Sequence, residues 1–199
     1  MAASERNEQE RSSWRQQVSP LPAKQFVFVD ECGSNIALTP LYGRAPKGQR
    51  VPDSVPRNRG KNTTLMAALS LSGMGAAMII EGSATASAFE IYIEQILAPS
   101  LQPGHLVVMD NLRAHKGQRV REAIQARGAQ VLFLPSYSPD LSPIEEAFSK
   151  LKAFLRRVGA RSREELVEAL SRALETITAQ DALGYFTHCG YFPADQQGL

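Results

Sequence analysis

The sequence is poor in cysteine and has no long apolar run. Its two cysteines, Cys32 and Cys189, are too few and too far apart for a disulfide framework or a cysteine-rich metal cluster. A reducing cytoplasm is therefore the expected compartment. The first residues lack an apolar signal core, and no stretch of about 18 apolar residues occurs anywhere. We expect an intracellular protein that does not bind a membrane.

An excess of charge of one sign is also missing. The formal net charge is +2 and the pI is near 8.6, so charge alone gives no argument for a nucleic-acid partner. With 199 residues, 43% of them hydrophobic, the chain can bury one sizeable core, and we expect one domain over residues 25–199. Residues 1–24 are mostly polar and charged, with Trp14 their only large aromatic residue, and they are predicted to be a flexible tail or the remnant of a linker.

Strand and helix patterns follow one another along the rest of the chain. Short β-branched and apolar runs predict strands, and apolar residues at helical spacing predict helices. We expect strands over residues 25–31, 36–41, 64–72, 76–81, 106–110 and 131–134, with a hairpin turn at 73–75, and helices over residues 86–97, 117–127, 143–158 and 163–177. This order predicts an α/β fold, with a mixed sheet flanked by helices.

Three acidic residues stand at comparable points of this predicted sheet. Asp30 and Asp110 end buried strands, and Glu145 opens the helix that follows a third strand. Ligands of such sheets bind beyond the carboxyl ends of the strands, so we expect the three carboxylates to meet at one edge. Carboxylate oxygens bind Mg²⁺ or Mn²⁺, and two such ions about 4 Å apart stabilise the attacking and leaving oxygens of phosphoryl transfer. The sequence thus predicts a site for metal-dependent phosphoryl transfer.

A second role competes for Glu145. Pro143 suits the first helical position and Ser142 the N-cap. Ser142 and Glu145 also have the spacing of a capping box, in which the glutamate turns back to the Ser142 amide and has no chemical role. A side chain folded back in this way cannot reach a metal, so the two roles stay open. Glu146 is expected to pair with Lys150 one turn further on.

Three motifs give a more specific interpretation. They are Phe-Val-Asp-Glu at 28–31, Val-Met-Asp-Asn-Leu-x-x-His-Lys at 108–116 and Leu-Pro-x-Tyr-Ser-Pro-Asp-x-x-Pro-Ile-Glu at 134–145, with 34 residues between Asp110 and Glu145. In order and spacing they resemble the catalytic domain of bacterial insertion-sequence transposases of the mariner-like superfamily, in particular the insertion-sequence six-thirty family. The resemblance runs from about residue 26 to residue 191. Ser136 and Ser142 depart from the proline and asparagine that the family usually has.

The resemblance implies a fold, a reaction and partners. The fold is RNase H-like, Asp30, Asp110 and Glu145 are the catalytic and metal-binding residues, and the reaction is DNA cleavage and strand transfer with Mg²⁺ or Mn²⁺, as two ions. The implied partners are the ends of the insertion sequence, target DNA and a second copy of the chain in the active complex. Full-length members carry helix-turn-helix modules before this domain, which 24 polar residues cannot hold. We therefore expect a helix-turn-helix partner or upstream segment, and a location at the bacterial nucleoid.

Further residues are assigned by their position beside the acids or by their charge. Glu31, Asn111 and His115 are candidates for orienting the carboxylates. The alternatives are a solvated strand end for Glu31 and a contact with phosphate for Asn111 and His115. A histidine near a helix start is more often a surface or capping residue. Tyr137 is expected to pack under its turn. Contacts with DNA phosphates are expected from basic residues on the loop after residue 41 and on helix faces, where a solvated surface is the alternative. These residues are Arg44, Lys47, Arg50, Lys116, Arg119, Lys152 and Arg156.

Two other functions compete with this interpretation. The apolar strand ending in Asp30 and Glu31 also fits the magnesium-binding strand of P-loop nucleotide hydrolases. That class needs an upstream Gly-x-x-x-x-Gly-Lys-Ser/Thr, which the sequence does not contain. The other alternative is a catalytically silent or domesticated domain that binds DNA or a partner without cutting. The intact set of three acids favours the enzyme.

Overall fold

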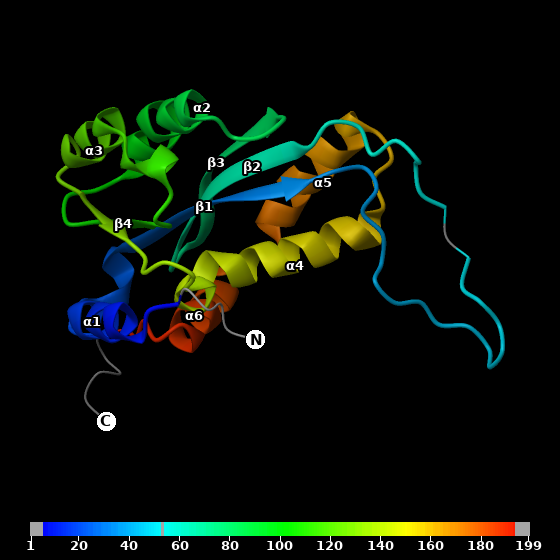
Figure 1. Cartoon of the computed structure of the whole chain (residues 1–199), viewed down its shortest axis with the longest axis horizontal. Coiled ribbons are helices and arrows are strands. Elements are labelled where there is room, and N and C mark those ends of the chain that lie inside the picture. The colour runs from blue at the N-terminus through cyan, green and yellow to red at the C-terminus, as the bar shows by residue number, and fades with distance from the viewer. Residues whose placement is uncertain (1–5, 53, 194–199) are drawn as a thin grey trace.

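A five-stranded mixed sheet forms the centre of the molecule (Figure 1), in a computed structural model that describes residues 6–52 and 54–193. The strands lie in the order β3-β2-β1-β4-β5. Their bounds are β1 Phe26–Ser34, β2 Thr63–Ser70, β3 Gly73–Glu81, β4 Leu106–Met109 and β5 Gln130–Phe133. β1, β2 and β3 pair in antiparallel fashion, whereas β4 and β5 continue the sheet parallel to β1. The predicted mixed sheet is confirmed.

Alternate residues of the central strands enter two separate cores. In β1, Phe26 and Phe28 point to one face of the sheet, and Val27 and Val29 point to the other. Both faces of the sheet are covered. The sequences of these strands are therefore continuous apolar runs and do not alternate between apolar and polar residues. The two cores fix the register of β1, because a shift by one residue would exchange its faces.

Helices cover each face (Figure 1). α2 (Ala86–Ile91), which continues as a π-helix over Tyr92–Leu97, and α3 (Gln118–Gln125) pack on the face of Val27. On the opposite face lie α1 (Glu8–Val18), α4 (Pro143–Val158), α5 (Arg163–Glu175) and α6 (Ala179–His188). Short 3-10 turns occur at Ala23–Gln25, Ala98–Ser100, Arg113–Lys116 and Pro139–Leu141. None of the described helices is long and apolar enough to cross a membrane.

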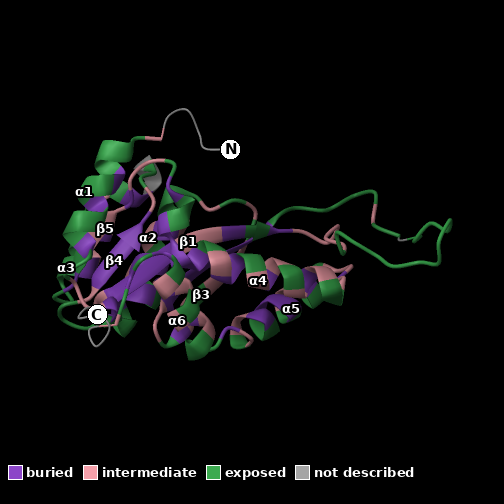
Figure 2. Ribbon diagram, turned by 90° about the horizontal axis from the view of Figure 1, so that it is seen from below, coloured by how far each residue is buried: buried purple, intermediate pink, exposed green. Residues whose placement is uncertain are grey.

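The chain between β1 and β2 differs from the expectation. β1 runs on to Ser34, and the strand predicted over residues 36–41 is absent. The carboxamide oxygen of Asn35 accepts a hydrogen bond from the amide of Ala37 (3.0 Å), a turn that ends the extended backbone. The chain then projects from the body as an exposed loop, described over residues 40–52 and 54–62 (Figure 2). The hairpin between β2 and β3 also turns earlier, at residues 71–72.

The prediction of a flexible tail is wrong for most of residues 1–24; residues 1–5 lie outside the described part of the chain. Asn7 is the N-cap residue of α1, and its side chain accepts hydrogen bonds from the amides of residues 9 and 10. Arg11, Trp14 and Val18 are buried on its inner side. These three positions share one helical face. Because one of them is an arginine, the sequence does not show a continuous apolar stripe there.

α6 is an element that the sequence analysis missed. Only Ala182 and Phe186 of this helix are buried among its apolar residues, and Gly184 weakens the helical pattern. Its start carried a signal, because Thr178 and Asp181 form a capping box. α6 packs against α4 and carries Cys189 at its end.

Candidate active site

The pairing of β1 with β4 places two of the three predicted acids side by side. The parallel register aligns Phe28 with Val108, and β4 ends one residue later, at Met109. Two residues beyond that pair, Asp30 and Asp110 stand next to each other. Asp30 is therefore not at the tip of β1, as expected, but at the point where β1 loses its parallel neighbour. Because β4 ends at Met109 while β1 continues to Ser34, β1 has no parallel neighbour beside the two aspartates.

The third acid arrives on the first turn of α4. Pro143 occupies the first helical position as expected, and Ser142 is the N-cap residue. Its side chain makes no capping hydrogen bond, so the capping box proposed for Ser142 and Glu145 does not form. The Glu145 side chain is exposed and lines the same cleft of about 500 Å³ as Asp30 and Asp110. Of the two roles that the sequence left open, the structure excludes the cap.

The cleft holds more negative charge than its surroundings neutralise. Burial raises the pKa of Asp30 to about 7, and the nearby carboxylates of Glu145, Glu31 and Asp110 add to the rise, against a hydrogen bond from the Glu31 amide. A cation among these oxygens would remove the like-charge repulsion. Because all three donors are hard carboxylate oxygens, the site fits Mg²⁺ or Mn²⁺.

His115 is buried beside the acids and not exposed at a helix start. Its Nε2 lies 3.0 Å from Glu31 Oε1 and its Nδ1 lies 2.5 Å from Asp110 Oδ1. The ring also stacks on Phe89, with centroids 4.2 Å apart. Although burial lowers the pKa of His115, its contacts with Asp110 and Glu31 raise it to about 9. The imidazole therefore bridges the carboxylates of Glu31 and Asp110 and fixes the orientation of the Asp110 side chain.

The turn from β5 to α4 supplies one wall of the cleft. Ser136 accepts a hydrogen bond from the Asn111 amide group (3.2 Å), so the serine that departs from the family pattern holds Asn111 in place. Tyr137 has a positive φ of 54° and is 58% exposed, so it does not pack under the turn as expected. Its ring lines the cleft. Sequence analysis missed this position because a positive φ at tyrosine leaves no signal in the sequence.

α1 anchors this turn from outside the cleft. The guanidinium of Arg11, which is fully buried, donates to both carboxylate oxygens of Asp140, at 2.9 and 2.6 Å. Trp14 Nε1 donates to the hydroxyl of Tyr191, which in turn donates to the carbonyl of Leu141. Both connections end in the 3-10 turn just before α4. The position of Glu145 therefore depends on a segment that precedes the sheet.

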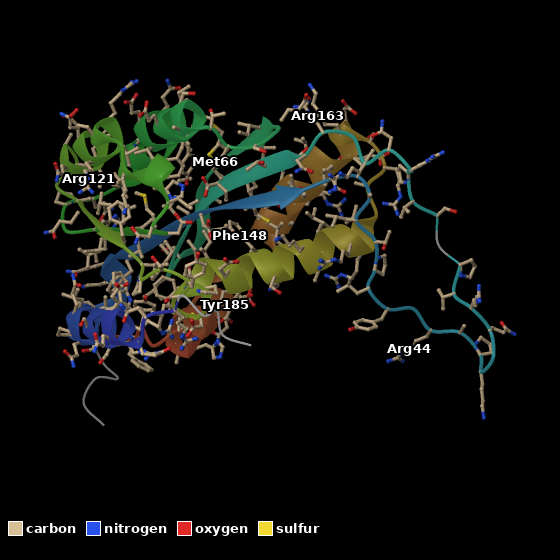
Figure 3. All side chains as sticks on the ribbon, viewed as in Figure 1. Arg44, Met66, Arg121, Phe148, Arg163 and Tyr185 are labelled. Atoms are coloured by element: carbon tan, nitrogen blue, oxygen red, sulfur yellow. The ribbon has the colours of Figure 1, made fainter. Side chains whose placement is uncertain are left out.

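The seven basic residues predicted to contact DNA lie outside the cleft in the described structure. Arg44, Lys47 and Arg50 are exposed on the projecting loop, as Figure 3 shows for Arg44. Lys116 lies over the Phe133 ring. Arg119 forms ion pairs with Glu90 and Glu94, and these two carboxylates neutralise its positive charge locally. Lys152 and Arg156 are partly buried on α4. Their contacts with DNA stay a prediction.

Glu146 does not pair with Lys150. It contacts His188 and Cys189 at the end of α6, and Lys150 forms an ion pair with Asp181 of the same helix, at 2.8 Å. Successive residues of a helix point about 100° apart, so Glu145 and Glu146 face different surroundings. Only Glu145 of the two lines the cleft.

Several solved structures of Mos1 transposase share the fold of this chain. The chain is similar to the pre-cleavage Mos1 transpososome (TM-score 0.69, 19% identity, 93% of this chain and 58% of that chain). It is likewise similar to the Mos1 mariner paired end complex with Mn (TM-score 0.68, 19% identity, 95% and 59%). The catalytic domain of Mos1 mariner transposase is covered more fully (TM-score 0.63, 16% identity, 92% and 84%). At these identities the likeness shows the fold, which is RNase H-like.

The chain spans less than two thirds of the Mos1 chains in the assembled complexes. No curated protein matches the sequence. A family model described as "DDE superfamily endonuclease" matches residues 25–167, which is well over half of the chain and includes Asp30, Asp110 and Glu145. The chain therefore belongs to the DDE superfamily endonucleases.

Proposed function

We propose that this domain is the catalytic part of a bacterial insertion-sequence transposase of the mariner-like superfamily, insertion-sequence six-thirty family, and that it cuts DNA strands and joins them to target DNA. The observation that carries the proposal is the cleft in which Asp30, Asp110 and Glu145 meet around a site short of positive charge. The solved Mos1 complexes with DNA ends and with Mg or Mn support the same chemistry.

Each side chain of the cleft has a distinct task in this reaction. Asp30, Asp110 and Glu145 would hold two Mg²⁺ or Mn²⁺ ions, which activate the attacking oxygen and stabilise the leaving oxygen of the phosphodiester. His115 fixes the orientation of Asp110 and Glu31 through its two ring nitrogens. Ser136 holds Asn111 at the rim, where its amide can donate to a phosphate oxygen.

The partners follow from the position of this domain in the larger proteins it resembles. Strand transfer brings together the insertion-sequence ends and target DNA, and recognition of the ends requires a helix-turn-helix segment or partner chain. We propose that the active complex contains a second copy of the domain. The exposed loop with Arg44, Lys47 and Arg50 would contribute phosphate contacts without reading the base sequence.

Cleavage of a plasmid that carries the element's ends tests the proposal. We expect the full chain to nick it with Mn²⁺ or Mg²⁺, and Asp110→Asn and Glu145→Gln to abolish nicking. Asp110→Asn should leave DNA affinity unchanged or raise it, because it removes one negative charge near the phosphates. Glu145→Gln should retain its thermal stability, since Glu145 makes no capping bond.

The control variant is Glu175→Gln, which changes an exposed carboxylate at the end of α5 in the same way. It should nick like the wild type. Nicking by Glu145→Gln would refute the assignment of the three acids. DNA binding without nicking by any form, with either ion, would identify the domain as the catalytically silent alternative.

A further inference from the structure

A second group of metal-binding side chains lies outside the catalytic cleft. Glu146 stands on the first turn of α4, and His188 and Cys189 stand at the end of α6. Glu146 Oε1 is 2.5 Å from Nδ1 of His188 and 3.7 Å from Sγ of Cys189, and the three ligand atoms lie within 4.8 Å of one another. One oxygen, one nitrogen and one sulfur donor thus converge on a single point.

The spacing of these atoms fits a tetrahedral metal ion. Zn²⁺ binds sulfur at about 2.3 Å and nitrogen or oxygen at about 2.0–2.2 Å, which places neighbouring ligand atoms roughly 3.3–3.7 Å apart. The distance between Sγ and Oε1 already has this value. The contact between Oε1 and Nδ1 must open by about 1 Å to reach the same geometry. The His188 side chain is 80% exposed and can make that movement.

A simple surface ion pair explains only part of this arrangement. It accounts for Glu146 and His188, but not for a buried thiol directed at the same carboxylate oxygen. A thiol is a weak hydrogen-bond donor, so it gains little from that contact.

We propose that Glu146, His188 and Cys189 form a zinc site, with water as the fourth ligand on the exposed side of His188. On binding, the S–H bond of Cys189 breaks, its proton leaves to solvent, and the sulfur donates the freed electron pair to Zn²⁺. Thiolate and imidazole ligands select zinc over Mg²⁺ and Mn²⁺, so this site and the oxygen-lined cleft take different ions.

The position of the site gives the ion a structural consequence. Lys150 and Asp181 already connect α4 to α6, and Glu146 lies one helical turn before Lys150 on the same side. Tyr185, labelled in Figure 3, lies on α6 near the start of α4. Zinc would therefore fix the end of α6 to the first turn of α4, which carries Glu145.

Cobalt(II) substitution tests the site directly. The full chain, freed of metal with a chelator, is titrated with Co²⁺ and followed by absorption. We expect one equivalent to produce the thiolate-to-cobalt charge-transfer band and the d–d bands of a tetrahedral ion, and Zn²⁺ to remove both by displacement. Cys189→Ser should lose the charge-transfer band. Cys32→Ala and Asp110→Asn should keep it, because neither changes the proposed ligands.

Thermal melting provides a readout that does not depend on spectra. Zn²⁺ should raise the Tm of the wild type and of His105→Gln, but not the Tm of His188→Gln or Cys189→Ser, whose folding without metal is verified by circular dichroism. A wild-type chain that gives no charge-transfer band would overturn the proposal. So would a band that persists in Cys189→Ser, or a zinc-induced rise in Tm that is equal in all four proteins.

Discussion

Two polar segments flank β1, and they behave in opposite ways. Residues 7–18 before the strand form a capped helix that packs on the sheet and contacts the turn before Glu145. Residues 40–62 after it form a loop that projects from the body and exposes almost all of its side chains. Both contain arginines and one large aromatic residue, Trp14 in the helix and Tyr42 in the loop. Composition alone therefore did not predict which segment would fold.

The difference comes from the spacing of a few residues. Arg11, Trp14 and Val18 recur at helical intervals and reach the core together, whereas Tyr42, Val51 and Val55 of the loop share no periodicity and remain 49–90% exposed. A buried arginine acts here as a core residue because Asp140 neutralises its charge. Packing and charge neutralisation, and not the number of apolar residues, separate the two segments.

Truncation of one aromatic residue in each segment should give the largest contrast. Trp14 is 6% exposed and Tyr42 is 90% exposed. Trp14→Ala removes a buried ring and its hydrogen bond to Tyr191, and it should lower the free energy of unfolding by about 3–5 kcal/mol. Tyr42→Ala should change it by less than about 0.5 kcal/mol. Urea denaturation followed by circular dichroism measures both, and a decrease below about 1 kcal/mol for Trp14→Ala would show that α1 is not part of the packed domain.

Acid pH should weaken the α1 segment through the pair of Arg11 with Asp140. The hydrogen bonds from Arg11 hold the pKa of Asp140 below its usual value near 3.9. The folded state therefore gains stability from this carboxylate above pH 4, roughly, and loses it as the pH falls through the lowered pKa. Asp140 is half exposed, so we expect a contribution of about 1 kcal/mol.

The measurement is the pH dependence of unfolding for the wild type and for Asp140→Asn. The variant should be less stable near neutral pH and should lose less stability than the wild type on acidification below pH 4, roughly. Glu175→Gln, which alters an exposed carboxylate, should follow the wild-type curve. Equal pH slopes for the wild type and Asp140→Asn would mean that the pair does not stabilise the fold.

Elements with strong local patterns were predictable from the sequence. The hairpin of β2 and β3, the short strand β4 and the amphipathic helices α3, α4 and α5 were all predicted within a few residues of their observed bounds. That Asp30, Asp110 and Glu145 line one cleft was predicted as well, because Asp110 follows β4 and Glu145 lies on the first turn of α4, although Asp30 lies within β1 and not at its end. Their catalytic and metal-binding roles stay a prediction. The missed helices α1 and α6 bury few apolar side chains, and their capping residues were their clearest local signals.

Long-range contacts decided the features that the sequence did not reveal. His115 and Glu31 are 84 positions apart in the sequence, but in the fold the His115 ring lies 3.0 Å from the Glu31 carboxylate. The local sequence around His115 therefore did not reveal that it is buried. The Glu145 side chain makes no capping interaction with Ser142. Glu146 contacts α6 in place of Lys150, because an i,i+4 pair within the helix is worth only a few tenths of a kcal/mol and competes with partners on the neighbouring helix. Helical spacing alone cannot rank such competing partners.

The loop offers the last and smallest effect on stability, and a clear effect on DNA. The combined change Arg44→Ala, Lys47→Ala and Arg50→Ala removes three exposed cations that no described residue holds in an ion pair. The free energy of unfolding should stay within about 0.5 kcal/mol of the wild type, because these side chains are exposed. The dependence of DNA affinity on salt should become shallower by about one unit of log–log slope for each phosphate that the variant no longer neutralises.

A control with the same change in charge distinguishes a DNA-binding loop from a general effect of net charge. Arg15 on α1, Lys24 just before β1 and Arg127 just after α3 are exposed. Figure 1 shows α1 and α3 at the end of the molecule away from the loop. Their combined change to alanine lowers the net charge by the same three units, but it should leave the salt slope near that of the wild type. If both triple variants lower the slope equally, the loop is only one part of a diffuse positive surface. If only the loop variant does so, the exposed basic side chains of the loop contact the phosphate backbone of DNA.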